Sequence, residues 1–209
     1  VNMIIKAWDS DYSLRGRLWG GGVRSLPDLP AGTRVLELGC GDGKTLSAMP
    51  PGWRVTALDI SLPALRLCNR SLSHSNLVLA DGERLPFKSE SFEGVFAYHV
   101  AGHLYLSGRR ALAGEVSRVL KPGGRLFFRE FARDDMRMGT GQEVEEATFL
   151  RGAGVITHYF TESETIELFC PLVPATMECV RWKMRVKGVD RVRSQVEAVF
   201  LKGFYGLKP

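Results

Sequence analysis

Three glycines at alternate positions, Gly39, Gly41 and Gly43, follow a short apolar run and let the backbone approach a ligand without an intervening Cβ. The apolar run at residues 35–38 has the length of a buried strand. We expect a helix to begin near Gly43, so that its free N–H groups and the positive end of its dipole face the turn. A strand, a glycine turn and a helix start in this order are typical of a site for a nucleotide-like molecule.

Three carboxylates accompany this turn at the ends of predicted strands. Asp59 ends the second predicted strand (residues 53–59), where it can accept hydrogen bonds from both hydroxyls of a ribose. Asp81 follows the third predicted strand (residues 77–80) and can accept from an exocyclic amine such as adenine N6. Glu37 lies just before the glycine turn. Three carboxylates favour a ligand that carries positive charge over one that carries several phosphates.

Aromatic and imidazole side chains lie where a reaction could occur. Tyr98 and His99 end the fourth predicted strand, beside the expected position of the reacting group. His99 is the candidate general base, and a wall residue that contributes only its backbone is the competing interpretation. Trp8, Tyr12 and Trp19 are candidates for a lid over the site, because the face of an aromatic ring attracts a cation. Plain packing against the sheet is the competing interpretation for all three.

The spacing of the glycines disagrees with two common phosphate-binding motifs. A dinucleotide-binding turn has the pattern G-x-G-x-x-G, whereas Lys44 follows the alternating glycines here, and no earlier glycine stands at the distance that a Walker loop requires. The four cysteines and four histidines show no metal-ligand spacing and no CxxC pair, so we expect no metal site. We expect mostly buried free thiols and a cytoplasmic protein.

Strands and helices alternate along the first part of the chain with short connections. The five predicted strands are residues 35–38, 53–59, 77–80, 92–98 and 125–128. Ser61, Ser107 and Thr161 are placed to cap helices. Apolar and basic residues alternate over residues 180–187, and the chain then turns near Gly188 and returns as a hairpin. The alternation of strands and helices predicts an α/β fold with a doubly wound parallel sheet.

These positions resemble the class I S-adenosylmethionine-dependent methyltransferases. Residues 35–43 match the first motif of that family, and residues 80–87, 92–95 and 118–126 are similar to its later motifs. Gly94 stands where the family usually has aspartate. The resemblance implies a Rossmann-like, doubly wound, seven-stranded and mostly parallel sheet whose last strand is antiparallel, which the terminal hairpin supports.

The resemblance also implies transfer of a methyl group from S-adenosyl-L-methionine, which leaves S-adenosyl-L-homocysteine. Alignment of donor and acceptor can contribute about 7–11 kcal/mol to such a transfer. The predicted cofactor-binding residues are Glu37, Gly39, Cys40, Gly41, Asp59, Ile60, Asp81, Gly82, Tyr98, Tyr12 and Trp19. A nucleotide-binding module that kept the fold without catalysis is the lesser alternative.

We expect one methyltransferase domain over residues 1–209, at a length that buries a sizeable core. Its predicted parts are an N-terminal lid segment (1–32), a cofactor-binding core (33–131), a substrate-covering insertion and helix (132–175) and a terminal β-hairpin (176–209).

The net charge of +5 is concentrated at the end of the chain, since residues 181–209 carry +6 and the remainder carries −1. The basic alternation in 181–187 could hold the phosphate backbone of RNA, whereas a solvated edge strand is the commoner explanation. The run at residues 98–101 lacks the Asn/Asp-Pro-Pro-aromatic pattern of nucleobase amino methyltransferases. A small-molecule acceptor is therefore favoured, with methylation of RNA such as tRNA as the alternative. No apolar run approaches the ~20 residues of a membrane span, so no membrane partner is expected.

Overall fold

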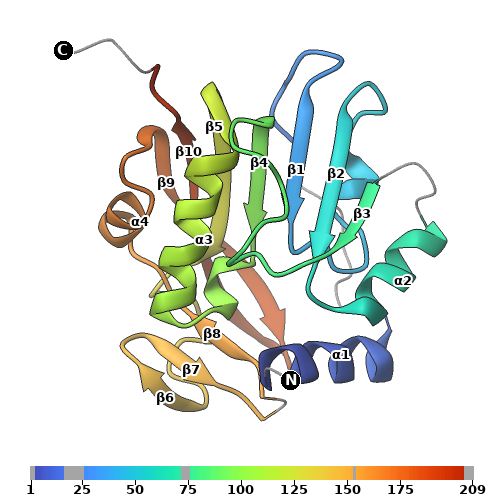
Figure 1. Ribbon diagram of the computed structural model, residues 1–209. Helices are drawn as coiled ribbons and strands as arrows, with labels where there is room; N and C mark the ends of the chain where they lie inside the picture. Colours follow the sequence, from blue (N-terminus) through green and yellow to red (C-terminus); the bar gives the residue numbers. More distant parts are fainter. Residues whose placement is uncertain (1–2, 17–25, 72–75, 153, 205–209) are drawn as a thin grey trace.

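Seven strands form one sheet in a computed structural model that describes residues 3–16, 26–71, 76–152 and 154–204 (Figure 1). In spatial order the strands are β3 (Asn76–Leu79), β2 (Arg54–Asp59), β1 (Arg34–Leu38), β4 (Phe92–Tyr98), β5 (Leu120–Phe131), β10 (Val189–Leu201) and β9 (Val173–Val186). The strands from β1 to β5 pair in parallel, and β10 runs antiparallel to both of its neighbours. The predicted seven-stranded, mostly parallel sheet with an antiparallel last strand is confirmed.

Both faces of the sheet are covered, which explains why its central strands are almost continuously apolar. On one face, α3 (Leu106–Val119) and α4 (Glu162–Leu168) pack over a large cluster that includes Leu36, Leu38 and Val95. On the other face, Val35 packs with Phe96 and neighbouring aromatic rings. Successive residues of a strand point to opposite faces, so β1 contributes to both clusters. This packing fixes the position of the glycine turn that follows β1.

The carboxyl ends of the parallel strands are covered by two elements that are far apart in the sequence. Figure 1 shows α1 (Met3–Arg15) lying across the end of the sheet to which β1 and β2 point, next to α2 (Leu62–Ser71). Beside α1 lies a small antiparallel sheet of β6 (Gln142–Glu145), β7 (Thr148–Leu150) and β8 (Ile156–His158). The short helix η2 (Ala101–His103) contacts β8. The sequence interpretation did not identify this second sheet, because strands of three or four residues carry little periodicity.

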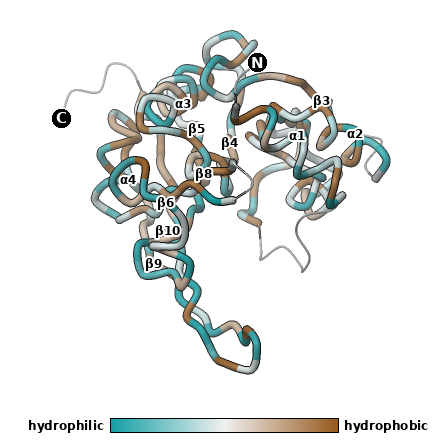
Figure 2. Tube along the Cα trace, turned by 90° about the horizontal axis from the view of Figure 1, so that it is seen from below, coloured by the Kyte–Doolittle hydropathy of each residue, from teal (hydrophilic) through white to brown (hydrophobic). Residues whose placement is uncertain are grey.

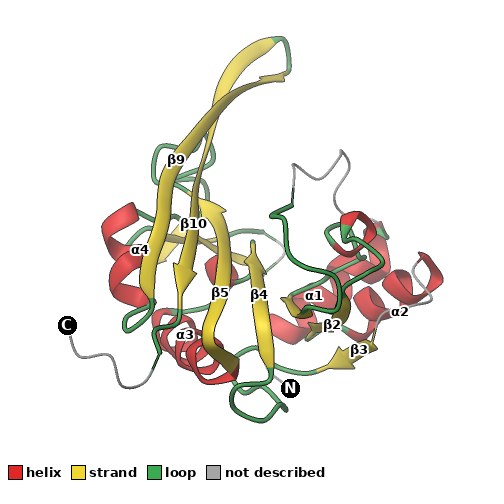
Figure 3. Cartoon of the chain, turned by 90° about the horizontal axis from the view of Figure 1, so that it is seen from above, coloured by secondary structure: helices red, strands yellow, loops and turns green. Residues whose placement is uncertain are grey.

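The terminal hairpin is longer than predicted. Strand β9 begins at Val173, ahead of the alternating segment that starts at residue 180. Its far half forms with β10 a twisted ribbon that projects well beyond the rest of the molecule (Figures 2 and 3). The half of the ribbon nearer the sheet pairs with β5 and contributes to the core.

Two predictions about helices need correction, and two are confirmed. The helix expected near Gly43 is only the 3₁₀ turn η1 (Leu46–Ala48), because the prolines that follow at 50–51 leave no room for an α-helix. Helix α3 begins at Leu106, so Ser107 lies inside it rather than at its N-cap. The Oγ of Ser61 accepts from the N–H of Ala64 at 3.4 Å, and Thr161 Oγ1 accepts from Glu164 N–H at 3.1 Å, as expected of N-caps.

All four cysteines are free thiols. Cys40 and Cys68 are buried, whereas Cys170 is exposed, so burial holds for only part of the set. Within the described ranges, no helix combines the length and the apolar character that crossing a bilayer requires.

Candidate functional site

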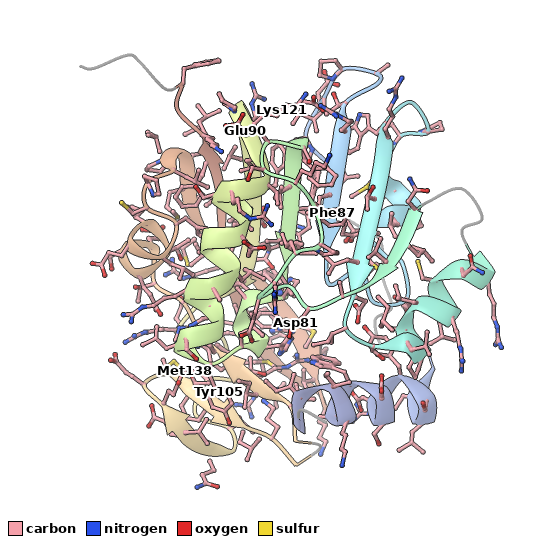
Figure 4. The ribbon with its side chains drawn as sticks, viewed as in Figure 1. Asp81, Phe87, Glu90, Tyr105, Lys121 and Met138 are labelled. Atoms are coloured by element: carbon pink, nitrogen blue, oxygen red, sulfur yellow. The ribbon has the colours of Figure 1, made fainter. Side chains whose placement is uncertain are left out.

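A cavity of about 560 Å³ opens at the carboxyl ends of the strands and extends from β3 to the β9–β10 ribbon. Figure 4 shows Asp81 at this end of the sheet, and Glu90 and Lys121 at the opposite end. The predicted cofactor-binding residues that line the cavity are Glu37, Gly39, Cys40, Gly41, Asp59, Ile60, Asp81, Gly82, Tyr98 and Tyr12. Trp19 lies outside the described residues, and its role as a lid remains a prediction.

The glycine turn follows a path that side chains would obstruct. Gly39 has φ +64° and Gly41 has φ +55°, both in the left-handed region that favours glycine. A Cβ on Gly41 would lie 2.4 Å from the hydroxyl oxygen of Tyr12, and one on Gly39 would lie 3.0 Å from a methyl carbon of Val100. The N–H of Cys40 donates to the carbonyl of Leu58 at 2.9 Å and ties the turn to β2. The turn therefore brings bare backbone to the cavity wall.

Asp59 is held rigidly at the tip of β2. One carboxylate oxygen accepts from the N–H of Gly41 and the other from the N–H of Ser61, both at 2.8 Å. Burial raises the pKa of Asp59, and the N–H donors of Ser61, Gly41 and Ile60 oppose that rise. A carboxylate has about four lone-pair sites, so with three N–H donors in place Asp59 can still accept from a hydroxyl of a ligand.

Glu37 is a buried carboxyl group, and one of its oxygens lacks a hydrogen-bond partner among the described residues. Its side chain is 4% exposed, and its Oε2 has no hydrogen-bond partner among the described residues. Burial raises the pKa of Glu37 well above its usual value, although a hydrogen bond with Thr45 opposes part of the rise. An ammonium group of a bound ligand would supply the missing donor and favour the charged carboxylate.

Asp81 and Gly82 form the cavity wall after β3. The Asp81 Oδ1 accepts from the N–H of Glu83 at 2.9 Å, and the side chain is only half-buried, so it can still bond to a ligand. A Cβ on Gly82 would lie 2.9 Å from a methyl carbon of Leu112. A larger residue next to Asp81 would therefore require the Leu112 side chain of helix α3 to shift.

Helix α1 covers the glycine turn with Ile4, Trp8 and Tyr12. Tyr12 is buried, and its pKa is raised by burial and by the neighbouring charge of Asp59. The Trp8 ring meets the His103 ring edge-on, with 4.8 Å between centroids. This arrangement agrees with the predicted lid for Trp8 and Tyr12, which both line the cavity.

His99 lines the cavity in an unusual backbone conformation, with φ +54°. Such a conformation in a residue other than glycine costs about 1–3 kcal/mol and is often found at functional sites. The His99 ring lies 4.7 Å from the Phe131 ring, and its Nδ1 is 3.8 Å from the carboxylate of buried Glu130, which exceeds hydrogen-bond distance. The geometry leaves the proposed base role of His99 a prediction.

His103 has a defined tautomer. Its Nδ1 lies 2.7 Å from the carbonyl oxygen of Ile156, and a carbonyl can only accept, so Nδ1 carries the hydrogen. Burial lowers the pKa of His103, which favours the neutral ring with a lone pair on Nε2. His103 lines the cavity and is the better-defined proton acceptor of the two histidines.

The far half of the cavity contains three arginines that the sequence interpretation did not place there. Arg129 on β5, Arg137 after β5 and Arg193 on β10 all line it, together with Phe131 and Trp182. The alternation in residues 180–187 was a usable signal, because it separates Trp182 and Met184 from the exposed basic residues. For Arg193 no local signal exists, because its partner Asp135 is distant in the sequence.

His158 is not among the residues that line the cavity. Both of its ring nitrogens form structural hydrogen bonds, to Thr148 and Glu164, each at 2.7 Å.

A family model described as a methyltransferase domain matches residues 36–128. The tRNA N(3)-cytidine methyltransferase METTL2 of Gallus gallus is 28% identical over 159 residues, which cover 68% of this chain and 43% of the relative. Phthiotriol/phenolphthiotriol dimycocerosates methyltransferase 1 of Mycobacterium ulcerans is 40% identical over 105 residues, which cover 47% of this chain and 37% of the relative. The chain thus spans less than half the length of these curated relatives.

Solved structures share the fold over most of the chain. A SAM-dependent methyltransferase from Methanosarcina mazei matches with a TM-score of 0.68 and 25% identity, over 84% of this chain and 94% of that chain. The 1,6-didemethyltoxoflavin-N1-methyltransferase of Burkholderia thailandensis, solved with its substrate and S-adenosylhomocysteine, matches with a TM-score of 0.62 and 21% identity. The match covers 97% of this chain and 79% of that one.

Proposed function

Because residues 36–128 of this chain form a methyltransferase domain of the class I S-adenosylmethionine-dependent family, we propose that the protein methylates a small-molecule acceptor. The observation that carries this proposal is the cavity itself, which joins a glycine turn and four carboxylates to a separate aromatic wall. Its volume of about 560 Å³ is typical of a small-molecule site.

The residues fit this methyl donor. Asp59 and Asp81 are placed to hold the ribose and the adenine, and the orphaned Oε2 of Glu37 is placed to accept from the ammonium group of the methionine end. When bound, the donor supplies a methyl group on cationic sulfur, which a lone pair of the acceptor takes while the sulfur keeps the electrons of the broken bond.

The protein's own residues orient the reactants and exclude water. Trp8 and Tyr12 of α1 close the cavity above the glycine turn, and Tyr98 and His99 form its wall at the tip of β4. An acceptor O–H or N–H must lose its proton, and neutral His103 offers Nε2 to receive it. Positioning accounts for the larger share of the expected rate enhancement.

Titration with S-adenosylhomocysteine tests the donor site. We expect quenching of tryptophan fluorescence, since Trp8 and Trp182 line the cavity. Asp59→Ala should weaken binding by about 10- to 150-fold for each hydrogen bond to the charged carboxylate that is lost. Asp28→Ala, at an exposed position, is the matched control. Tight NADH binding without a response to S-adenosylhomocysteine would contradict the proposal.

A second experiment addresses the acceptor. Transfer of labelled methyl groups to fractions of a cell extract, with and without nuclease treatment, separates small molecules from nucleic acid. We expect the labelled product to be small and insensitive to nuclease.

RNA is the second candidate acceptor, and the projecting β9–β10 ribbon is the observation that favours it (Figure 3). Lys183 and Lys187 are exposed along the ribbon. However, Arg181 pairs with Asp134 and Arg185 lies 3.3 Å from Asp190, so part of the basic charge of the ribbon is already balanced. This balance is why we favour the small molecule.

A further inference from the structure

We propose that the acceptor is a small planar molecule that carries a carboxylate, and that Arg193 and Arg137 bind this group. This inference rests on the proposed function, because it assigns the half of the cavity that the methyl donor leaves free. The observations that carry it are the distribution of charge along the cavity and an unused donor on buried Arg193.

Charge is segregated along the cavity wall. The lining residues from β1 to β3 include four carboxylates, namely Glu37, Asp42, Asp59 and Asp81. The described lining residues from β5 onward include three arginines and no carboxylate. The strand order places β5 and β10 on the opposite side of β4 from β1. The two halves of the cavity would therefore contact different ligands. A cationic donor suits the first half, and an anion suits the second.

Arg193 is a buried guanidinium with one donor unused. It is 6% exposed, and its Nε donates to the carboxylate of Asp135 at 2.6 Å. The same carboxylate accepts from the N–H of Ser194 at 3.0 Å. The Nη2 of Arg193 has no hydrogen-bond partner within the described part of the chain. A buried charged donor without a partner is costly, and a ligand oxygen would satisfy it.

Aromatic rings fix the plane of this guanidinium. Its central carbon lies 4.6 Å from the centroid of the Phe131 ring and 5.7 Å from that of Trp182. Phe131 in turn lies 4.7 Å from the ring of His99, which ends the wall where transfer is expected. A single aromatic ring, that of Phe131, thus lies between Arg193 and the His99 wall. A planar acceptor that contacts these rings would place its carboxylate against the edge of the guanidinium.

Two further arginines add to the positive charge. Arg137 lines the cavity, and burial together with the neighbouring charges of Arg193 and Arg151 lowers its pKa, while the carboxylate of Asp135 opposes part of the fall. Arg129 lies over the Tyr98 ring at 4.4 Å and bonds Glu197 at 3.0 Å, while its Nε is buried without a partner among the described residues. An anion in this half of the cavity would offset part of the positive charge.

The chemistry favours a small carboxylate over the phosphate backbone of RNA. Arg193 is buried between aromatic rings, whereas backbone-binding arginines lie on an accessible surface. The planar, two-oxygen carboxylate matches the fork of a guanidinium.

The test compares a panel of aromatic carboxylates, such as 4-hydroxybenzoate and 2-naphthoate, with their neutral amides by calorimetry in the presence of S-adenosylhomocysteine. We expect at least one acid to bind about tenfold or more tightly than its amide. Arg193→Gln and Arg137→Gln should each remove that preference and leave the affinity for S-adenosylhomocysteine within about twofold. Arg185→Gln, on the exposed part of the ribbon, should change neither.

Three results would overturn the proposal. The first is the absence of any preference for acids over amides across the panel. The second is a parallel loss of S-adenosylhomocysteine affinity in the arginine variants, which would assign them to the carboxylate of the donor. The third is a loss of tRNA binding in Arg193→Gln, which would assign the cluster to RNA. If Arg193→Gln does not fold, because Asp135 is left unpaired, Arg137→Gln and Trp182→Leu carry the same test.

Failure of the proposed function would look different. In that case S-adenosylhomocysteine does not bind the wild-type protein, while the preference for acids over amides persists without it.

Discussion

Adding one methyl group at Gly41 should displace helix α1 from the glycine turn. A Cβ at this position would lie 2.4 Å from the Tyr12 hydroxyl oxygen, whereas a carbon–oxygen contact normally requires about 3.3 Å or more. Tyr12 must therefore move by about 1 Å in Gly41→Ala. Because Tyr12 is buried on α1 above the cavity, that movement should open the lid.

The magnitude has two parts that can be separated. An alanine in the left-handed region costs about 1–2 kcal/mol, whatever surrounds it. Overpacking against Tyr12 adds about 1–3 kcal/mol. Gly32→Ala is the matched control, since Gly32 has φ +84° and a Cβ there would meet nothing within 4 Å. Gly32→Ala should therefore lose only the about 1–2 kcal/mol of unfolding free energy that comes from the left-handed backbone.

A double-mutant cycle isolates the contact. In Tyr12→Phe the hydroxyl is gone, and the nearest remaining ring atom would lie 3.4 Å from the new Cβ, an ordinary contact. The double variant Tyr12→Phe/Gly41→Ala should therefore recover about 1–3 kcal/mol of unfolding free energy relative to the sum of the single variants. Urea unfolding measures this coupling, and calorimetry with S-adenosylhomocysteine should show affinity lost in Gly41→Ala and partly restored in the double variant.

A coupling within about 0.5 kcal/mol of zero would refute the reasoning. It would mean that Tyr12 does not lie over the turn, and the lid formed by α1 would have to be abandoned. Equal losses of affinity in Gly41→Ala and Gly32→Ala would have the same consequence.

Three further predictions concern charge. The raised pKa of Glu37 means that this carboxyl group binds its proton more tightly in the folded protein than in the unfolded chain. The protonated group therefore stabilises the fold fully below about pH 4.5, and this stabilisation is lost as the pH rises through the pKa of Glu37 in the folded protein. Glu37→Gln should therefore gain unfolding free energy relative to wild type in urea titrations as the pH rises, and weaken S-adenosylhomocysteine binding by about 10- to 150-fold in calorimetry. The lowered pKa of His103 has the opposite effect, because the neutral ring stabilises the fold fully above about pH 6.5 and this stabilisation is lost as the pH falls. In the same urea titrations, His103→Gln should therefore lose less unfolding free energy than wild type between about pH 7.5 and 5.5. The paired change Lys183→Glu/Arg185→Glu should leave methylation of a small molecule intact, and a loss of salt-dependent tRNA binding in a mobility-shift assay would instead favour RNA.

The lining of the half of the cavity that we propose for the donor could be predicted from the sequence because its geometry is local. Each carboxylate lies at or beside a strand that is identified by its own apolar residues, and parallel neighbours end at the same edge of the sheet. Asp59 and Asp81 meet the glycine turn for this reason. The helix after the turn was overestimated, because the pattern of small residues does not distinguish an α-helix from the 3₁₀ turn that the prolines at 50–51 impose.

The acceptor half could not be predicted in the same way, because its geometry depends on distant pairings. Arg193 enters the cavity only because β10 pairs antiparallel with β5 and Asp135 lies within reach. In the sequence Arg193 is one more basic residue in a basic tail. The short strands β6 to β8 were missed for a related reason, since they are held in place by contacts such as that of Ile156 with His103.

The order of the strands also explains how one cavity can hold two ligands of opposite charge. The chain proceeds outward from β1 to β3 and then returns to β4, so the acidic strand ends lie on one side and the later arginines on the other. A donor whose positive charge is lost during transfer needs the acidic groups at its distal parts, where they hold it without opposing the reaction. An acceptor anchored by its own carboxylate on Arg193 can present a different atom to the methyl group, because the guanidinium is fixed between aromatic rings. Separation of the two charges along the sheet thus positions both reactants.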